Sequence, residues 1–145
     1  DSFETFVHWS ALEETIEAVK ARVVQEHKFR CLPGKPFIGS RITQLYHEGA
    51  CVYFYFCMLY DNVNDPSTVF AEIEHEGRTE ILRRGGSLSH HHGIGKIRAE
   101  LLMKTGTPSF RDTLQSVKQA LDPNNIFGAQ NGNFSVQTKG TKRMQ

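Results

Sequence analysis

Residues 50–60, Ala-Cys-Val-Tyr-Phe-Tyr-Phe-Cys-Met-Leu-Tyr, form the most apolar run of the chain. The run is rich in aromatic residues, which favour β-strands. It is too short to span a bilayer as a helix, so it predicts a strand rather than a membrane segment. Large side chains occupy both alternating sets of positions, and we therefore expect a strand that is covered on both faces.

A second predicted strand, residues 37–46, precedes this run. Ile38, Ile42 and Tyr46 are expected to share one side of it, because side chains two residues apart point the same way. Only a short turn containing Gly49 separates the two strands. They are therefore predicted to form a hairpin.

Helices are predicted on both sides of the hairpin. Residues 10–28 carry apolar side chains at helical spacing, with Ser10 as N-cap and Glu13 as its capping-box partner. The next helix begins at Asp65, has proline as its first helical residue and ends before a pair of glycines. The remaining expected elements are a strand over residues 2–7, a short helix over residues 97–104 and a helix between Thr107 and Asp122.

The order helix, strand, strand, helix predicts an α+β fold with a ferredoxin-like core, followed by C-terminal helices. Residues 1–128 are expected to form this domain. Residues 129–145, rich in Asn, Gly, Thr, Lys and Gln, are expected to form a disordered tail. Because the chain begins at Asp1 rather than methionine, we expect a fragment or a processed form of a longer protein.

The composition excludes several classes of protein. Hydrophobic residues make up 39% of the 145 residues and charged residues 23%, so the chain is neither wholly disordered nor fibrous. There are 17 Lys and Arg against 16 Asp and Glu, and a net charge of +1 gives no general attraction to nucleic acid. The three cysteines lack Cys-x-x-Cys spacing, which argues against a disulfide framework and a structural zinc site.

Residues 85–96, Gly-Gly-Ser-Leu-Ser-His-His-His-Gly-Ile-Gly-Lys, are the strongest sign of a functional site. Imidazoles exchange protons near neutral pH, and glycines let backbone N–H groups approach a phosphate or a flavin closely. Lys96 adds positive charge, so the segment suits an anionic ligand that exchanges protons. In an extended segment His90 and His92 would share one face and His91 the other, a poor arrangement for zinc, and we predict no metal. The alternative is a tract of histidines that are solvated or bonded to backbone carbonyls.

Several further positions each have two interpretations. Tyr53 and Tyr55 either pack in the core or line a site. Arg41 either points to solvent or faces a ligand anion. Residues 122–128 predict a helix stop with an Asx turn.

Three segments together resemble one known family: residues 85–96, residues 49–56 (Gly-Ala-Cys-Val-Tyr-Phe-Tyr-Phe) and residues 121–128 (Leu-Asp-Pro-Asn-Asn-Ile-Phe-Gly). They are similar to the C-terminal part of the alkyldihydroxyacetonephosphate synthase family, flavoproteins of the vanillyl-alcohol-oxidase type. Residues 1–5 and 41–44 also resemble segments of that family, so the resemblance extends over residues 1–128.

The resemblance implies an enzyme that uses FAD without net oxidation or reduction. It would exchange the acyl chain of acyl-dihydroxyacetone phosphate for a long-chain fatty alcohol and so form the ether bond of ether lipids. The family implies a peroxisomal location, a homodimer and peripheral membrane contact in the full enzyme. It also implies an FAD-binding domain before this segment, so residues 1–128 are expected to be the cap or substrate domain, inactive alone. An FAD-linked oxidoreductase acting on a 2-hydroxy acid is the alternative.

The resemblance also implies roles for single residues. The predicted site residues are, as catalytic groups, Tyr53, His90, His91 and His92; as cofactor contacts, the same histidines and Asn125; and as substrate contacts, Arg41 and Lys96. A non-enzymatic metal-binding module built on the three histidines is a further alternative. The lack of a cysteine or acidic partner at ligand spacing disfavours that module.

Overall fold

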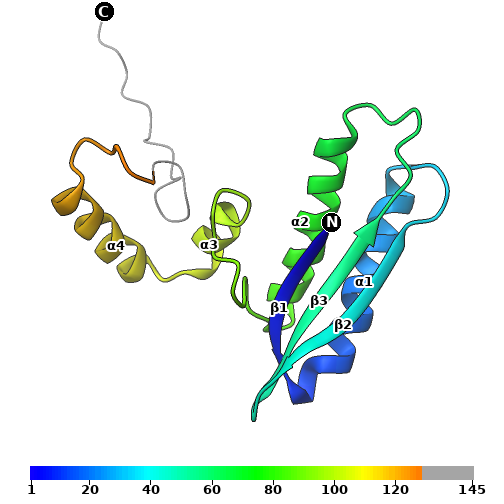
Figure 1. Ribbon diagram of the computed structural model, residues 1–145, viewed down its shortest axis with the longest axis horizontal. Helices are drawn as coiled ribbons and strands as arrows, with labels where there is room; N and C mark the ends of the chain where they lie inside the picture. The colour runs from blue at the N-terminus through cyan, green and yellow to red at the C-terminus, as the bar shows by residue number, and fades with distance from the viewer. Residues whose placement is uncertain (129–145) are drawn as a thin grey trace, which may run out of the picture. The chain divides into compact units, whose positions relative to one another are not determined.

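The computed structural model of the protein describes residues 1–128, and the tail predicted at residues 129–145 lies outside these described residues. The chain divides into two compact units, Asp1–His91 and a second that begins at His92. The elements of the first unit are β1 (Ser2–His8), α1 (Leu12–Phe29), β2 (Phe37–Leu45), β3 (Gly49–Cys57) and α2 (Pro66–Arg83), with a 3-10 turn at Trp9–Ala11 before α1 (Figure 1).

The first unit is an antiparallel sheet in the order β1-β3-β2, with α1 and α2 packed together on one face (Figure 1). The predicted α+β fold and its helix–strand–strand–helix core are confirmed. A ferredoxin-like pattern ends in a fourth strand, and residues 1–128 contain only three strands. Residues after α2 instead reach the edge of β1, where the Ser87 N–H donates to the Phe6 carbonyl at 2.9 Å. The ferredoxin-like detail is therefore not confirmed.

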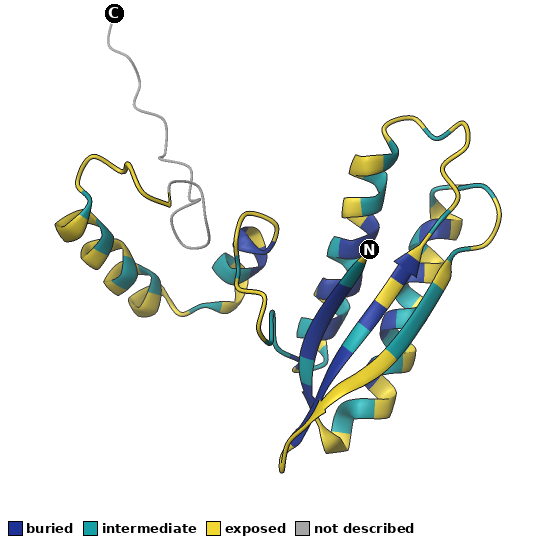
Figure 2. Ribbon diagram, in the orientation of Figure 1, coloured by how far each residue is buried: buried dark blue, intermediate teal, exposed yellow. Residues whose placement is uncertain are grey.

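Side-chain alternation along β3 separates the core from the opposite face of the sheet. Val52, Phe54 and Phe56 are fully buried in the core between the sheet and the two helices. Burial is concentrated on β1, β3 and the inner sides of the helices (Figure 2). The expectation that β3 is covered on both faces is confirmed for residues 49–52, which are all buried. It is wrong for the rest of the strand, where Tyr53 is half-buried and Tyr55 and Cys57 are exposed on the side away from the helices. We call this side, which carries Tyr53 and Tyr55, the site face.

Aromatic stacking organises the core. The rings of Phe3 and Phe54 stack with centroids 5.3 Å apart, and those of Phe56 and Phe70 with centroids 4.6 Å apart. The guanidinium of Arg78 lies 5.2 Å from the Phe3 ring centroid, a cation–π contact. These contacts tie β1, β3 and α2 into one apolar layer.

The two predicted helix starts have different outcomes. The Asp65 carboxylate caps α2 as expected, accepting a hydrogen bond from the Thr68 N–H at 3.3 Å. Ser10 is not the N-cap of α1; the helix begins at Leu12 after the 3-10 turn and has no side-chain cap bond. The Trp9 N–H donates to the carbonyl of Glu48 at 3.0 Å. This tertiary bond holds the 3-10 turn against the hairpin. Local capping preference had predicted that these residues form the first turn of the helix.

The second unit contains α3 (Ala99–Thr105) and α4 (Pro108–Leu121). Thr107 caps α4, accepting a hydrogen bond from the Phe110 N–H at 3.2 Å. The helix stop predicted after α4 is present, and the Asp122 carboxylate accepts from the N–H groups of Ile126 and Phe127 at 2.9 Å each. These bonds run four and five residues along the chain, whereas an Asx turn bonds the N–H two residues on, so they are not the predicted Asx turn. Among residues 1–128, no helix combines the length and the apolar character that crossing a membrane requires.

Replacement of Phe54 by alanine removes a fully buried ring from the aromatic core. We expect the Phe54→Ala variant to lose about 3–5 kcal/mol of unfolding free energy, measured by chemical denaturation. Phe37→Ala, at a position that is 61% exposed, is the matched control and should change stability little. Equal losses in the two variants would contradict the core assignment.

The carboxylate of Glu80 should make stability depend on acid pH. Hydrogen bonds from Arg83, and then from Arg84, lower its pKa from 4.5 to about 2. Since the folded-state pKa lies below the unfolded value, the stabilisation is present above pH 4.5 and is lost as the pH falls toward 2. In Glu80→Gln this contribution, about 1–2 kcal/mol after allowance for solvent screening, should be absent at pH 7. Glu13→Gln, at an exposed position, is the control in denaturation curves at pH 3 and 7.

Candidate functional site

A hollow of about 440 Å³ lies on the site face. Its lining residues come from β2, β3 and the loop after α2: Thr43, Gln44, Cys51, Tyr53, Tyr55, His90 and His91. The sequence predicted Tyr53, His90 and His91 as site residues, and the fold brings these three together. Hydroxyl, thiol, amide and imidazole groups thus share one hollow, which suits a polar ligand that exchanges protons.

The strand register places Tyr53 in a row across the sheet. It pairs with Glu4 of β1 on one side and with Arg41 of β2 on the other. Directly opposed residues in antiparallel strands point to the same face. Arg41 is exposed on the site face but is not among the residues lining the hollow. Its predicted contact with a substrate anion stays a prediction.

A bulge in β2 moves Tyr46 to the site face. The register shifts between Ile42 and Gln44, so that Ile42 pairs with Val52 and Gln44 with Cys51. Because one extra residue reverses the alternation, the expectation that Tyr46 shares a side with Ile42 is wrong. Tyr46 was therefore missed as a site residue, and only the position of the bulge would have revealed it.

A close approach of the loop after α2 to β1 brings the histidines to the hollow. Gly86 is buried, and a Cβ at this position would lie 2.6 Å from Ile81 Cγ2 and 3.0 Å from Thr5 Oγ1. Only glycine therefore fits without displacement of the loop. Next to it, the Phe6 N–H donates to Ser87 Oγ at 2.8 Å, and the Thr5 hydroxyl donates to the Ser87 carbonyl at 2.8 Å.

The buried carboxylate of Glu4 fixes the histidine tract. One oxygen accepts from the Ser89 hydroxyl at 2.8 Å, and the other accepts from the His90 N–H at 2.5 Å. Glu4 is fully buried, so these bonds to a charged acceptor are strong. Sequence reasoning missed Glu4, although a carboxylate within the apolar strand Ser-Phe-Glu-Thr-Phe-Val was a signal that could have identified it.

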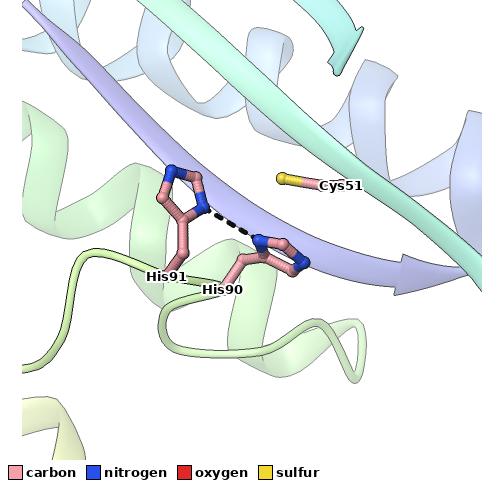
Figure 3. A group of neighbouring side chains, drawn as sticks. All are labelled: Cys51, His90 and His91. Atoms are coloured by element: carbon pink, nitrogen blue, oxygen red, sulfur yellow. Dashed lines mark hydrogen bonds between the residues drawn. The ribbon is translucent and has the colours of Figure 1, made fainter. Parts of the chain in front are cut away.

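The imidazole rings of the first two histidines of the tract contact each other. His90 Nδ1 and His91 Nδ1 are 2.8 Å apart, and their rings form an edge-on pair (Figure 3). The expectation that they point to opposite faces is wrong. The segment is bent rather than extended, because Glu4 holds the His90 backbone.

Each imidazole also reaches a phenol. His91 Nε2 lies 2.8 Å from the Tyr53 hydroxyl, and His90 Nε2 lies 2.8 Å from the Tyr46 hydroxyl. Burial raises the pKa of the Tyr53 phenol, and the negative charge of Glu4 raises it further. Tyr53 therefore stays protonated near neutral pH and can donate a hydrogen bond.

Cys51 lies close to the imidazole pair. The donor atoms of Cys51, His90 and His91 are within 4.8 Å of one another (Figure 3). The expectation that the histidines lack a cysteine partner is therefore wrong, because strand pairing supplies one that is distant in sequence. Burial raises the pKa of the Cys51 thiol, whereas metals bind the thiolate. The absence of a bound metal stays a prediction.

The other predicted site residues belong to the second unit. His92, Lys96 and Asn125 are exposed there. Asn125 lies in the turn after α4 and donates its N–H to the Asp122 carbonyl at 3.0 Å. The proposed roles of these three residues in cofactor or substrate binding stay predictions.

Comparison with protein families gives the class of protein to which this α+β chain belongs. The model of the FAD linked oxidases, C-terminal domain, matches residues 1–131, and the chain belongs to this family. FAD is thus confirmed as the cofactor of the enzyme class. The resemblance to the alkyldihydroxyacetonephosphate synthases is confirmed by individual relatives.

Alkyldihydroxyacetonephosphate synthase of Caenorhabditis elegans is 38% identical over 131 residues, 90% of this chain and 22% of the relative. An uncharacterized FAD-linked oxidoreductase, YgcU, of Escherichia coli K12 is 30% identical over 125 residues, 82% of this chain and 25% of the relative. A solved structure of alkyldihydroxyacetonephosphate synthase has the same fold, with a TM-score of 0.57 at 24% identity over 88% of this chain and 20% of that one. The chain thus spans about a quarter or less of the length of these relatives.

Neutralisation of Glu4 should be visible at Tyr53. In Glu4→Gln the negative charge that helps to raise the pKa of Tyr53 is gone, so we expect that pKa to fall. The measurement is a titration of the Tyr53 ring carbons by NMR. Glu13→Gln, an exposed position on α1, should leave the Tyr53 titration unchanged. A Tyr53 pKa that is the same or higher in Glu4→Gln would contradict the electrostatic link.

Proposed function

We propose that this chain is part of an alkylglycerone-phosphate synthase. The enzyme would exchange the acyl chain of acyl-dihydroxyacetone phosphate for a long-chain fatty alcohol. The bond between the glycerone carbon and the acyl oxygen breaks, a bond to the alcohol oxygen forms, and the alcohol proton leaves with the fatty acid. The proposal is supported by the similarity to named synthases and rests above all on the Tyr53–His91 hydrogen bond.

Proton transfer is the work that these residues can do. The reaction requires a proton to leave the substrate carbon and later a proton for the departing or entering oxygen. Tyr53 is neutral and bonded to an imidazole, so its hydroxyl can give one proton to His91 while taking another. In this proposal Tyr53 is the group that contacts the reacting carbon, and His91 and His90 hold the exchanged proton.

The hollow also fits the expected cofactor. The rings of Tyr53 and Tyr55 are stacked with centroids 6.1 Å apart beside imidazole and amide groups, a donor set that suits a flat ring with polar edges. FAD, when bound, would supply an electron-accepting ring that activates the substrate carbon. His90 and His91 would hold it from this face, with His92 and Asn125 as further contacts. Arg41 of the first unit and Lys96 of the second are each proposed as a substrate contact.

Further features of the proposal concern the whole enzyme. We propose a homodimer in peroxisomes with peripheral membrane contact, as the resemblance to the synthase family implies. Residues 1–128 would be its cap or substrate domain, which alone would not complete the reaction. An FAD-linked oxidoreductase acting on a 2-hydroxy acid is the second candidate, favoured by the similarity to YgcU.

The test uses the full-length flavoprotein that contains this chain. Tyr53→Phe and His91→Ala should each lower the rate of acyl-for-alkyl exchange by about 100-fold or more, the usual contribution of acid–base groups. Tyr60→Phe, an exposed tyrosine outside the hollow, should exchange at the normal rate. Exchange that is unaffected in both site variants would reject the assignment, and anaerobic bleaching of the flavin by a 2-hydroxy acid would favour the second candidate.

A further inference from the structure

The two imidazoles and two phenols of the site form one unbroken chain of hydrogen bonds. From Tyr53 Oη the chain passes to His91 Nε2, from His91 Nδ1 to His90 Nδ1, and from His90 Nε2 to Tyr46 Oη. Each of the three contacts is 2.8 Å. Both nitrogens of each ring are therefore used, one toward a phenol and one toward the other ring.

The contact between the two Nδ1 atoms restricts the protonation of the neutral pair. A hydrogen bond between them requires a proton on one Nδ1 and none on the other. If His91 carries it, His91 Nε2 accepts from Tyr53 and the His90 Nε2–H donates to Tyr46. If His90 carries it, His90 Nε2 accepts from Tyr46 and the His91 Nε2–H donates to Tyr53. The two neutral states thus differ only in the direction of the whole chain.

We propose that these four side chains are a proton relay and that Tyr46 is its outer end. This proposal rests on the proposed function, in which Tyr53 meets the reacting carbon. Tyr46 is 42% exposed and Tyr53 is half-buried, so the chain leads from the hollow toward solvent. Tyr46 would then be a positioning and relay residue rather than one that contacts substrate.

The relay moves one proton without leaving a charge on any member. Tyr53 accepts the substrate proton on Oη as its own proton passes to His91 Nε2. The His91 Nδ1 proton passes to His90 Nδ1, and the His90 Nε2 proton passes to Tyr46. The proton that Tyr46 held goes to water. Each residue keeps the number of protons it had, and the reversed chain can return a proton when an oxygen needs one.

Both ends of the relay are held by the sheet. Tyr53 lies within β3, and the N–H of Tyr46 donates to the Gly49 carbonyl at 2.8 Å at the end of the hairpin. The Trp9 indole N–H donates to the Tyr46 carbonyl at 3.1 Å, and Glu4 holds the His90 N–H. Donor and acceptor distances in the chain are therefore set by backbone anchors, as fast proton transfer requires.

The first test reads the imidazole tautomers in the 145-residue chain by ¹⁵N NMR. We expect one protonated Nδ1 shared by His90 and His91. Tyr46→Phe should shift the nitrogen signals of His91 as well as those of His90, although Tyr46 does not bond to His91. A change confined to His90 would overturn the relay, since the four groups would not then be coupled. Tyr60→Phe should move neither histidine.

The second test measures turnover of the full-length flavoprotein. Tyr46→Phe should lower kcat about 10-fold with KM unchanged, raise the solvent deuterium isotope effect and recover rate when imidazole buffer is added. A lower kcat with neither change in isotope effect nor rescue would mean that Tyr46 only orients His90, and an unchanged kcat would also reject the relay. If the unmodified protein shows no exchange, the proposed function fails. The NMR result still decides whether the four side chains of the hydrogen-bond chain are coupled.

Discussion

The alternation of side chains along β3 is the constraint on which the rest of the structure depends. Val52, Phe54 and Phe56 must point to the helices to complete the core, so Tyr53 must point to the site face. The residues that stabilise the fold and the tyrosine proposed for catalysis are thus neighbours in sequence. A slip of β3 by one residue would expose the aromatic core and bury the tyrosine.

A buried charge connects this strand to the histidine loop. Glu4 is opposite Tyr53 in the sheet, and its carboxylate binds the backbone of His90. The same charge disfavours ionisation of the Tyr53 phenol. Removal of a buried carboxylate from water is costly unless its oxygens are hydrogen-bonded. The need to satisfy Glu4 therefore fixes the loop, and a fixed loop places His90 and His91 within hydrogen-bond distance of two phenols.

The sequence predicted what depends on local pattern and missed what depends on pairing between strands. Hydrophobic spacing predicted the helices and strands, and three adjacent histidines between glycines indicated the candidate site, into which the fold brings two of them. Ser10 failed as a cap because a bond from Trp9 to the hairpin reshapes the start of α1. Tyr46 could not be recognised, because its position depends on a bulge that no local pattern encodes. Glu4 was missed although a carboxylate within an apolar strand marked it, because its bond to the His90 backbone joins segments that are distant in sequence.

The bulge in β2 has a consequence for how this site tolerates change in chain length. Between Ile42 and Gln44 the strand has one residue more than its partner. Deletion of Thr43 would straighten β2 and leave Tyr46 facing the histidines. Insertion of a residue without a second bulge would turn Tyr46 toward the helices. Homologous chains with a single-residue insertion in this segment should therefore lack a phenol at the position of Tyr46 on the site face. Chains without the insertion should keep it, and the core should be the same in both.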